Sequence, residues 1–456
     1  MASSFSSFYG LSPIWLQEAI LGSRGLARRM LRESGSFWTI LDNLRQSQWF
    51  SEPELHEYQQ ERLAALVRHA AKEVPYYRSG FTEWNLDPEQ FHDLDHLSRI
   101  PLLSKRDVVR AGRSLVAGRR WTPTFEGTTS GSTGLTLTGF RDLTSIRSEN
   151  AFLWRQLEWA GWHPGDRSAW LRGDFVVPLN QKRPPYWRVN RADDVLMLSS
   201  FHLSEETADA YLDALRQYDP VIIQAYPSSI AYLGRYLASR GKYYRGDRLK
   251  GVITSSETLL EDQRKVIDQR FGCRVFDWYG QYERVAAIGT CEKGSYHVVS
   301  DYGFTQFLPC TDGTAEIVGT GFFNFAMPLI RYRTGDNVVL AKSGTRCSCG
   351  RSFPIVERVV GRIDDYVKTP DGRRIGMFAI IFEGLQHIWE VQAIQEALDE
   401  IRILVVPMPQ FSVEDERELV SRAKELVGPE MRIRIERVLE IKRTERGKIR
   451  TVICRV

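Results

Sequence analysis

The feature that most constrains the fold is an alternation of short apolar runs with helical segments between about residues 165 and 340. The apolar runs have the length and residue types of buried strands. They are RSAWLRG (167–173), PVIIQAYP (220–227), LKGVITSSE (249–257) and CRVFDWYG (273–280). Helical segments separate them: YLDALRQ (211–217), SIAYLGRYLASRG (229–241) and LLEDQRKVIDQRFG (259–272). This order predicts a largely parallel sheet covered by helices, in which ligands bind beyond the carboxyl ends of the strands.

The chain is long enough for a large domain and a small one. Its 456 residues are 43% hydrophobic, which permits a sizeable buried core. We expect a mixed α/β fold with a large domain over residues 1–363, in which parallel sheets are flanked by helices, and a small, mobile α+β domain over residues 364–456. Residues 1–55 should form a helical N-terminal extension. The helical segment 61–77 should stop at Pro75.

The pattern changes near residue 360. The segment 361–376 (GRIDDYVKTPDGRRIG) is typical of a linker followed by a strand pair that turns at Pro370-Asp371-Gly372. Beyond this pair we expect two helices and two strands, IRILVVP (401–407) and MRIRIERVLEI (431–441).

Charge and hydropathy exclude several function classes. The formal net charge of +4 is small for this length and gives no argument for a nucleic-acid partner. No run of 18 apolar residues occurs, so we expect no transmembrane segment. Gln17 and Glu18 interrupt the apolar stretch near the N-terminus, and we expect an amphipathic helix there that packs on the domain. The six cysteines are too sparse for a disulfide framework, which fits a cytoplasmic location.

The strongest site signal is a run of seven glycine or hydroxyl-bearing residues, Thr128-Thr129-Ser130-Gly131-Ser132-Thr133-Gly134. Small side chains let the backbone approach a phosphate closely, while N–H groups and hydroxyls supply donors. The run is not a P-loop, because no lysine follows Gly134. A flexible loop has the same composition, so this run alone leaves both interpretations open.

Two later motifs carry groups that suit a nucleotide. The segment 276–283 (FDWYGQYE) places aromatic residues at a strand end, where a base can stack, and ends in Glu283, whose carboxylate can hold Mg²⁺. In RYRTGD (331–336), Asp336 follows a tight glycine turn and can accept the hydroxyls of a ribose. Taken alone, each carboxylate is as well explained as a surface or turn residue.

Two motifs near the C-terminus carry cations. Arg362 in GRIDD (361–365) can neutralise a phosphate with a forked contact. Lys448 in RGKIR (446–450) can reach into a cleft as a point charge. The alternative for both segments is ordinary solvent exposure.

Together, the order and spacing of these motifs resemble the adenylate-forming superfamily of acyl-CoA synthetases, luciferases and peptide-synthetase adenylation domains. Within it, the chain is most similar to the phenylacetate–CoA ligase-like branch, especially the CapK type. TSGSTG resembles the phosphate-binding loop, Ser255-Ser256-Glu257 the segment that lines the adenine, and YGQYE the YGxTE motif. RYRTGD resembles the ribose motif, GRIDD the hinge and RGKIR the mobile catalytic-lysine loop. The segments VPYYR (74–78) and IPLLSK (100–105) are also typical, and the resemblance covers roughly residues 55–456.

The resemblance implies a role for each motif. The run from Thr129 to Gly134 would hold the ATP phosphates, as would Arg362, and Glu283 would bind Mg²⁺. Asp336 would accept the ribose hydroxyls. Asp364 would be the hinge, and Lys448 would contact the substrate carboxylate and the α-phosphate. The remaining ATP-binding candidates are Ser255, Ser256, Glu257, Tyr279, Gly280 and Gln281.

The implied activity is formation of an acyl- or aryl-adenylate from ATP and a carboxylic acid, with release of pyrophosphate. The acyl group would then pass to an acceptor, an amine or hydroxyl of a small molecule or sugar. The alternative acceptor is coenzyme A, giving a thioester. A further alternative is a catalytically impaired nucleotide-binding relative, because Tyr282 replaces the threonine of the YGxTE motif. The sequence does not indicate the oligomeric state.

The acyl pocket should be formed by the helix after Ala225-Tyr226-Pro227-Ser228, the strand that ends at Ser255, and the turn at Tyr279-Gly280. Aromatic walls would suit an aryl or compact apolar acid. The candidate lining residues are Trp170, Tyr226, Ser228, Trp278 and Tyr279. Core packing is the alternative role for the aromatic ones.

Four residues have the types required for a tetrahedral zinc site. They are Cys291, His297, Cys347 and Cys349. The two pairs are about 50 residues apart in sequence and would have to face each other. A zinc ion held by all four would be structural, because no coordination position would remain for a substrate.

Overall fold

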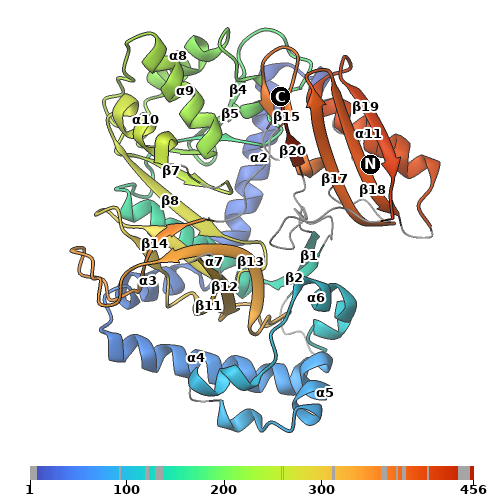
Figure 1. Ribbon diagram of the computed structural model, residues 1–456. Helices are drawn as coiled ribbons and strands as arrows, with labels where there is room; N and C mark the ends of the chain where they lie inside the picture. The colour runs from blue at the N-terminus through green and yellow to red at the C-terminus, as the bar shows by residue number, and fades with distance from the viewer. Residues whose placement is uncertain are drawn as a thin grey trace.

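The computed structural model describes most of the chain. The described residues are 8–91, 94–118, 123–128, 137–257, 259, 261–310, 314–360, 367–375, 378–382, 387–407, 410–439 and 452–456. The fold is mixed α/β, as the sequence predicts, with one large sheet, its covering helices and a separate small sheet near the C-terminus (Figure 1).

Helices form the N-terminal part of the chain. They are α2 (Ile14–Arg32), α3 (Phe37–Ser47), α4 (Glu52–Glu73) and α5 (Pro75–Glu83). Helix α4 begins with a capping box in which Ser51 and Glu54 satisfy each other's backbone N–H groups. It ends before Pro75, which opens α5, so the predicted stop is confirmed. The elements that follow are η1 (Pro88–Gln90), η2 (Leu94–Arg99), α6 (Lys105–Ala111), η3 (Gly112–Leu115), β1 (Thr124–Thr128) and β2 (Thr138–Asp142).

The parallel half of the large sheet contains the four predicted strands. In spatial order its strands are β8, β7, β6, β3 and β5, and every neighbouring pair is parallel. Their bounds are β3 (Ser168–Arg172), β5 (Val195–Ser199), β6 (Ile222–Ala225), β7 (Gly251–Ser255) and β8 (Arg274–Gly280). Antiparallel β4 (Trp187–Asn190) closes this edge.

Helices cover both faces of this half. Helices α8 (Ala208–Tyr218), α9 (Pro227–Ser239) and α10 (Glu261–Phe271) lie on one face, where Ala169 and Leu171 of β3 point into a buried apolar cluster. Helix α7 (Leu143–Trp159), with α2 and α3, covers the other face. Because side chains alternate along a strand, the residues of β3 between these apolar ones face α7.

The other half of the sheet is antiparallel, which differs from the predicted largely parallel arrangement. Beyond β8 every pair of neighbours is antiparallel. The strands are β9 (Ala287–Thr290), β10 (Tyr296–Val298), β11 (Gly303–Pro309), β12 (Ala315–Gly321), β13 (Tyr332–Leu340) and β14 (Ile355–Val359). The reason is connection length: only residues 281–286 join β8 to β9, too few for the crossover that parallel strands need.

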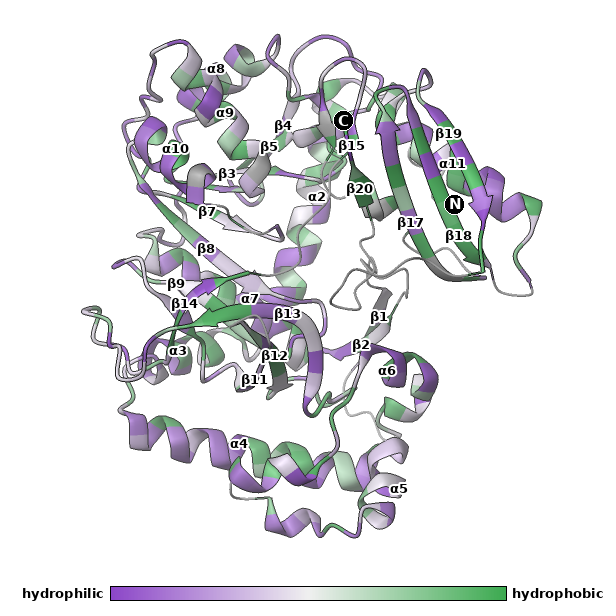
Figure 2. Ribbon diagram, viewed as in Figure 1, coloured by the Kyte–Doolittle hydropathy of each residue, from purple (hydrophilic) through white to green (hydrophobic). Residues whose placement is uncertain are grey.

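The C-terminal part contains a hairpin and a four-stranded sheet. Strands β15 (Val367–Lys368) and β16 (Arg374–Ile375) pair around Gly372, whose φ of +84° suits a glycine, as the predicted turn requires. The four-stranded sheet has the order β19-β18-β17-β20, and Figure 2 shows β18 and β20 as hydrophobic strands. The elements are η5 (Phe378–Phe382), β17 (Ile388–Ala397), β18 (Glu400–Pro407), α11 (Val413–Val427), β19 (Arg432–Arg437) and β20 (Val452–Cys454).

The prediction of two helices in this part of the chain is wrong. Among the described residues α11 is the α-helix, and β17 is a strand although its residues include helix formers. Strand β17 pairs with β18 on one side and with β20 on the other. This pairing satisfies its backbone on both edges, and such tertiary contacts override local propensity.

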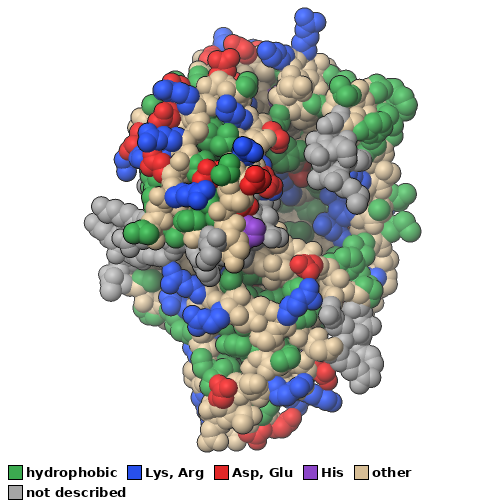
Figure 3. All heavy atoms as spheres, turned by 90° about the vertical axis from the view of Figure 1, so that its right-hand side faces the viewer, with side chains coloured by type: hydrophobic (Ala, Val, Ile, Leu, Met, Phe, Trp, Pro, Cys, Tyr) green, Lys and Arg blue, Asp and Glu red, His purple; other side chains and the backbone are tan. Residues whose placement is uncertain are grey.

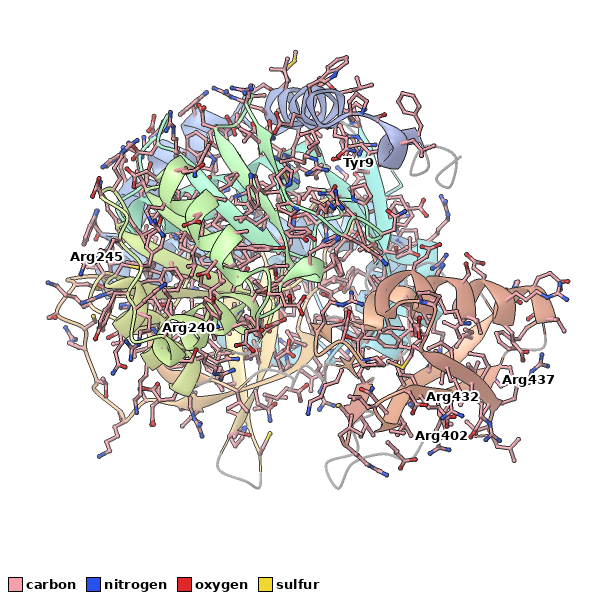
Figure 4. All side chains as sticks on the ribbon, turned by 90° about the horizontal axis from the view of Figure 1, so that it is seen from above. Tyr9, Arg240, Arg245, Arg402, Arg432 and Arg437 are labelled. Carbon is pink, nitrogen blue, oxygen red and sulfur yellow. The ribbon has the colours of Figure 1, made fainter. Side chains whose placement is uncertain are left out.

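Helix α2 packs on the large domain, as expected, but through its polar side. Arg188 Nε donates to Gln17 Oε1 at 2.6 Å, and the Val189 N–H donates to Glu18 Oε1 at 2.9 Å. Arg28 pairs with Asp193 at 2.9 Å. Seen from above in Figure 4, α2 lies along the outer edge of the molecule. None of the helices in the described part of the chain has the length and apolar character needed to cross a membrane.

A buried ion pair joins the helical and antiparallel parts of the large domain. Arg155 of α7 contacts Asp301, after β10, with Nη1–Oδ2 and Nη2–Oδ1 distances of 2.6 and 3.0 Å. Arg155 Nη1 also donates to the Leu44 carbonyl at 2.9 Å, and the Ser47 hydroxyl donates to Asp301. Both charged side chains are almost fully buried, at 2% and 0% exposure. The remaining donors and acceptors of the pair are therefore used by α3.

Replacing Asp301 by asparagine should lower the free energy of unfolding by about 3–5 kcal/mol, because the Arg155 charge would stay buried without its counter-charge. Urea unfolding followed by tryptophan fluorescence measures this change. The matched control is Asp213→Asn, since Asp213 pairs with Arg216 at the surface; its effect should stay below about 1 kcal/mol. Equal effects of the two substitutions would contradict the role given to the buried pair.

Candidate active site

Two of the predicted nucleotide motifs meet through a direct hydrogen bond. Tyr279, near the end of β8, donates its hydroxyl to Asp336 Oδ2 at 3.0 Å. Asp336 lies on β13 and is only 9% exposed, and its N–H donates to the Thr334 hydroxyl at 3.1 Å. Gly335 precedes it with a φ of +73°, a conformation that favours glycine. The bond to Tyr279 uses one carboxylate oxygen of Asp336.

The same two motifs meet a second time at Glu283. The Tyr332 hydroxyl donates to Glu283 Oε1 at 3.0 Å, and Tyr332 is almost fully buried. Glu283 itself is half-buried. A buried tyrosine therefore fixes the position of the carboxylate predicted to hold Mg²⁺. Sequence reasoning passed over Tyr332, although it stands inside the RYRTGD motif.

The segment IPLLSK is attached to the same strand. Leu103 exchanges backbone hydrogen bonds with Arg331 and Arg333, at 3.0 and 2.9 Å. Arg331 has a φ of +53° and donates Nη1 to the Ser98 carbonyl at 2.7 Å. The start of the RYRTGD motif is thus held by the segment before α6.

Two further predicted residues have features expected beside a ligand. Ser256, directly after β7, has a φ of +72°, which costs energy for a residue with a side chain and is found mainly at functional turns. Both polar atoms of the Gln281 amide are buried without a partner among the described residues. An unpaired buried amide is costly unless a ligand or water completes it. These observations fit a nucleotide-binding turn.

Glu257, beside Ser256, is half-buried. The segment follows the β7 residue Ser255, which pairs with Trp278 of β8.

Tyr282, which departs from the family pattern, fills a slot formed by two glycines. Gly127 of β1 and Gly139 of β2 stand opposite each other in the β1–β2 ladder. A Cβ on Gly127 would lie 2.4 Å from the Tyr282 hydroxyl, and one on Gly139 would lie 2.7 Å from its ring. The guanidinium of Arg141 lies 3.5 Å from the ring centroid, and its Nη2 donates to the Tyr282 carbonyl at 2.6 Å. Tyr282 therefore packs against both β1 and β2, the strands that precede and follow the predicted phosphate loop.

A cavity of about 320 Å³ lies between the parallel strands and helices α2, α3 and α7. Of the residues predicted for the acyl pocket, Trp170 and Trp278 line it, together with Ser255. Tyr226 and Tyr279 do not line it, and α9 covers the opposite face of the sheet. The burial of Tyr226 raises its pKa to about 12. Helix α7 takes the place that the sequence analysis gives to the helix after Ser228, whose side chain is not described.

Cationic residues that sequence reasoning did not single out line the same cavity. Two guanidinium groups lie near the ring of Trp170, that of Arg28 at 5.0 Å and that of Arg172 at 4.9 Å from the ring centroid. Burial lowers the pKa of Arg172, whose Nη2 donates to the Gln224 amide oxygen. Burial also lowers the pKa of Arg32 to about 10, and nearby Arg28 acts in the same direction. In the sequence these arginines are marked only by their positions near the end of a strand or a helix, which does not single them out as site residues.

The surface also offers a hollow with positive charge. On the face shown in Figure 3, Lys and Arg side chains (blue) lie within a hollow. In Figure 1, β1 and β2 lie between the large body and the small C-terminal sheet. A cationic surrounding of this kind suits a polyphosphate.

Several predicted site residues lie outside the described residues, so their roles stay predictions. They are Thr129, Ser130, Gly131, Ser132, Thr133, Gly134, Arg362, Asp364 and Lys448. The division at residue 364 likewise stays a prediction.

The four predicted zinc ligands come together. All four ligand atoms of Cys291, His297, Cys347 and Cys349 lie within 4.8 Å of one another. Cys291 and His297 are fully buried. The cluster lies on the antiparallel half of the sheet, among residues that pack against α3 and α7.

Comparison with known proteins identifies proteins that resemble this chain. Residues 367–455 match the family described as the CapK C-terminal domain. The chain is 22% identical over 401 residues to protein CapK of Staphylococcus aureus, which covers 87% of each chain. It is 25% identical over 440 residues to the phenylacetate-coenzyme A ligase of Thermus thermophilus, which covers 88% of this chain and 96% of the relative.

A solved structure shares the fold. It is that of 2-hydroxyisobutyryl-CoA ligase in complex with 2-HIB-AMP and CoA in the thioesterification state. Its similarity has a TM-score of 0.57 at 18% sequence identity and covers 89% of this chain and 91% of that one. The chain is therefore similar in sequence to CapK and to the phenylacetate-coenzyme A ligases, and it shares the fold of 2-hydroxyisobutyryl-CoA ligase.

Proposed function

We propose that this chain uses ATP to convert a carboxylic acid to an acyl-adenylate and then transfers the acyl group to the thiol of coenzyme A. The observation that carries the proposal is a pair of hydrogen bonds between the end of β8 with the turn after it and β13. The Tyr279 hydroxyl donates to Asp336, and the Tyr332 hydroxyl donates to Glu283. Residues predicted to contact the base, the ribose and the metal are thereby linked to one another, which supports a shared nucleotide site.

The reaction consists of two displacements. A carboxylate oxygen of the acid attacks the α-phosphorus of ATP, and the bond to the bridging oxygen breaks, so that pyrophosphate leaves. The thiol sulfur then attacks the acyl carbon, AMP leaves with the electron pair of its C–O bond, and the thiol proton passes to water. Both steps depend on positioning and charge neutralisation more than on proton transfer.

Each described residue would bind or orient rather than react. Asp336 accepts a hydrogen bond from Tyr279, and its carboxylate would also accept from the ribose hydroxyls. The half-buried carboxylate of Glu283 has the oxygen chemistry that Mg²⁺ prefers, and the ion would neutralise phosphate charge. Arg362 and Lys448 would add positive charge at the phosphates, and Lys448 would arrive by rotation of the small domain about Asp364.

The cavity supports an aromatic or compact acid that also carries a hydrogen-bond acceptor. Trp170 and Trp278 supply flat apolar walls, and Arg172 supplies a buried cation at the carboxyl end of β3. Arg172 Nε is buried without a hydrogen-bond partner among the described residues, so the guanidinium would gain from an added acceptor. Acids without such a group should react more slowly.

Exchange of labelled pyrophosphate into ATP, measured over a panel of acids, tests the proposal. Exchange should require the acid, and mass spectrometry after addition of coenzyme A should find the acyl thioester. An amide or ester formed with an added amine or sugar would select the other acceptor class. No exchange with any acid, together with no ATP binding by calorimetry, would overturn the proposal.

Asp336→Ala and Glu283→Gln should each lower the exchange rate by about a hundredfold or more, because charge-assisted contacts to the nucleotide are lost. Asp336→Ala should chiefly raise the KM for ATP, and Glu283→Gln should shift the Mg²⁺ dependence to higher concentration. The matched control is Asp213→Asn at the surface, which should leave both unchanged. Wild-type kinetics in either active-site variant would remove that residue from the site.

The packing of Tyr282 supports an active enzyme over the impaired relative. Tyr282→Phe keeps the ring in its slot between Gly127 and Gly139 and should retain turnover within about threefold. Tyr282→Thr removes the ring and the Arg141 contact, so the phosphate loop should lose its support and the KM for ATP should rise about tenfold. A higher turnover of the threonine variant would instead show that the native site is impaired.

A further inference from the structure

The cysteine–histidine cluster has the edge lengths of a tetrahedral metal site. The sulfurs of Cys291 and Cys347 are 3.6 Å apart, and Cys349 Sγ is 3.4 Å from His297 Nε2. Around a tetrahedral Zn²⁺, bond lengths give separations of ~3.8 Å between two sulfurs and ~3.6 Å between sulfur and nitrogen. No disulfide links the cysteines. The four ligand atoms thus stand at coordinating separations without a covalent bond among them.

Neighbouring groups orient the ligands. His297 Nδ1 faces the Phe353 carbonyl at 3.1 Å, which fixes the ring so that Nε2 points at the cluster. Backbone N–H groups donate to two of the sulfurs: Lys293 to Cys291 Sγ at 3.3 Å, and Arg351 to Cys349 Sγ at 3.5 Å. Such donors stabilise a thiolate, the form that binds metal.

We propose that Cys291, His297, Cys347 and Cys349 bind one structural Zn²⁺ ion. The ion would fasten the segment between β13 and β14, which has no secondary structure from 341 to 354, to the β9–β10 hairpin. Four protein ligands leave no open position for a substrate, so the ion has no part in the chemistry.

The cluster is connected to the strand of Asp336 through two strand pairings. His297 stands opposite Ile355 in the β10–β14 ladder, and β14 pairs with β13, which carries Asp336. Arg351 reinforces the same segment, because its guanidinium lies over the rings of Trp49 and Trp159 and its Nη1 donates to both carboxylate oxygens of Glu292. Loss of the ion should therefore loosen β14 before it affects Asp336.

Metal analysis of the purified full-length protein tests this proposal. We expect about one zinc ion per chain, and Co²⁺ added to metal-free protein should give the visible absorption of a tetrahedral cobalt thiolate site. Cys347→Ser and Cys349→Ser should lose the zinc and melt at lower temperature. The matched control, Cys310→Ser, lies outside the cluster and should keep both.

Three results would overturn the proposal. One is wild-type protein that holds no zinc and gives no cobalt spectrum. Another is a disulfide between Cys291 and Cys347 in metal-free native protein. The third is zinc retained by both serine variants. The wild-type measurements stay decisive where a variant does not fold.

A separate observation concerns the outer face of α2. The residues of α2 that are exposed are Ile14, Trp15, Ala19, Ser23, Arg24, Leu26, Ala27, Arg29 and Met30. Trp15 is 68% exposed and Met30 is 67% exposed, while the preceding Leu11 is 89% exposed. An apolar face turned to water on a helix whose polar side is buried points to a partner.

The charges of this face identify the kind of partner. Its exposed charged residues are Arg24 and Arg29, and the acidic residue of α2, Glu18, is turned toward Val189. Directly after the helix, the half-buried Glu33 pairs with Arg29 at 3.3 Å. Pairing with a second copy about a two-fold axis would bring these arginines together without carboxylates from the helix. An anionic lipid surface supplies both the apolar layer and the phosphates that such a face requires.

We infer that the outer face of α2 lies on anionic membrane surfaces, with Trp15 at the level of the headgroups. Flotation of the full-length protein with vesicles measures this. Binding to vesicles of phosphatidylcholine and phosphatidylglycerol should exceed binding to phosphatidylcholine alone by about tenfold and should fall with salt.

Trp15→Glu and Leu26→Glu should each lower vesicle binding at least about tenfold, since a carboxylate would enter the apolar layer. The matched control is Leu398→Glu, an exposed leucine on the small domain, which should bind like the wild type. Equal binding by all variants, or no binding to anionic vesicles at low salt, would overturn the inference. So would a dimer in light scattering that Trp15→Glu dissociates.

Discussion

The site depends on the contact between the end of β8 and the middle of β13. Tyr279 and Asp336 are 57 positions apart in the chain, and Glu283 and Tyr332 are 49 apart, yet one hydroxyl-to-carboxylate bond joins each pair. Each carboxylate keeps further acceptor capacity for a ligand. The fold thus supplies two fixed acceptors on a partly buried surface, which is the arrangement that recognition of a ribose and a metal-bound phosphate requires.

The rest of the large domain stabilises the strand that carries Asp336. The Arg155–Asp301 pair attaches the region after β10 to α3 and α7. The cysteine–histidine cluster lies where β10 meets β14, and β14 is the neighbour of β13. On the other side, Leu103 and the carbonyl of Ser98 hold the start of the RYRTGD motif. Rigid support of this kind would let the predicted phosphate loop be short and rich in glycine.

Much of this architecture follows from local sequence patterns, and the rest depends on long-range pairing. The parallel strands were predictable because each is a short apolar run bounded by turn residues. The antiparallel half was not, since it depends on which hairpins pair across the sheet. Strand β17 was not among the predicted strands, because its residues include helix formers whose local preference is outweighed by pairing on both edges. The slot for Tyr282 exists only because the β1–β2 register places Gly127 opposite Gly139. Likewise, Arg28 and Arg172 approach Trp170 from separate elements, and no local motif marks them. The order of the six motifs did indicate the resemblance, because a chance match to all of them in the same order is improbable.

A crystal structure with a non-hydrolysable acyl-sulfamoyl adenosine tests the central claim most directly. The account predicts the ribose hydroxyls within about 3 Å of the Asp336 carboxylate, the adenine beside Tyr279 and the acyl group directed toward Trp170. A nucleotide bound at another surface, with the Tyr279–Asp336 and Tyr332–Glu283 pairs away from any ligand, would contradict it.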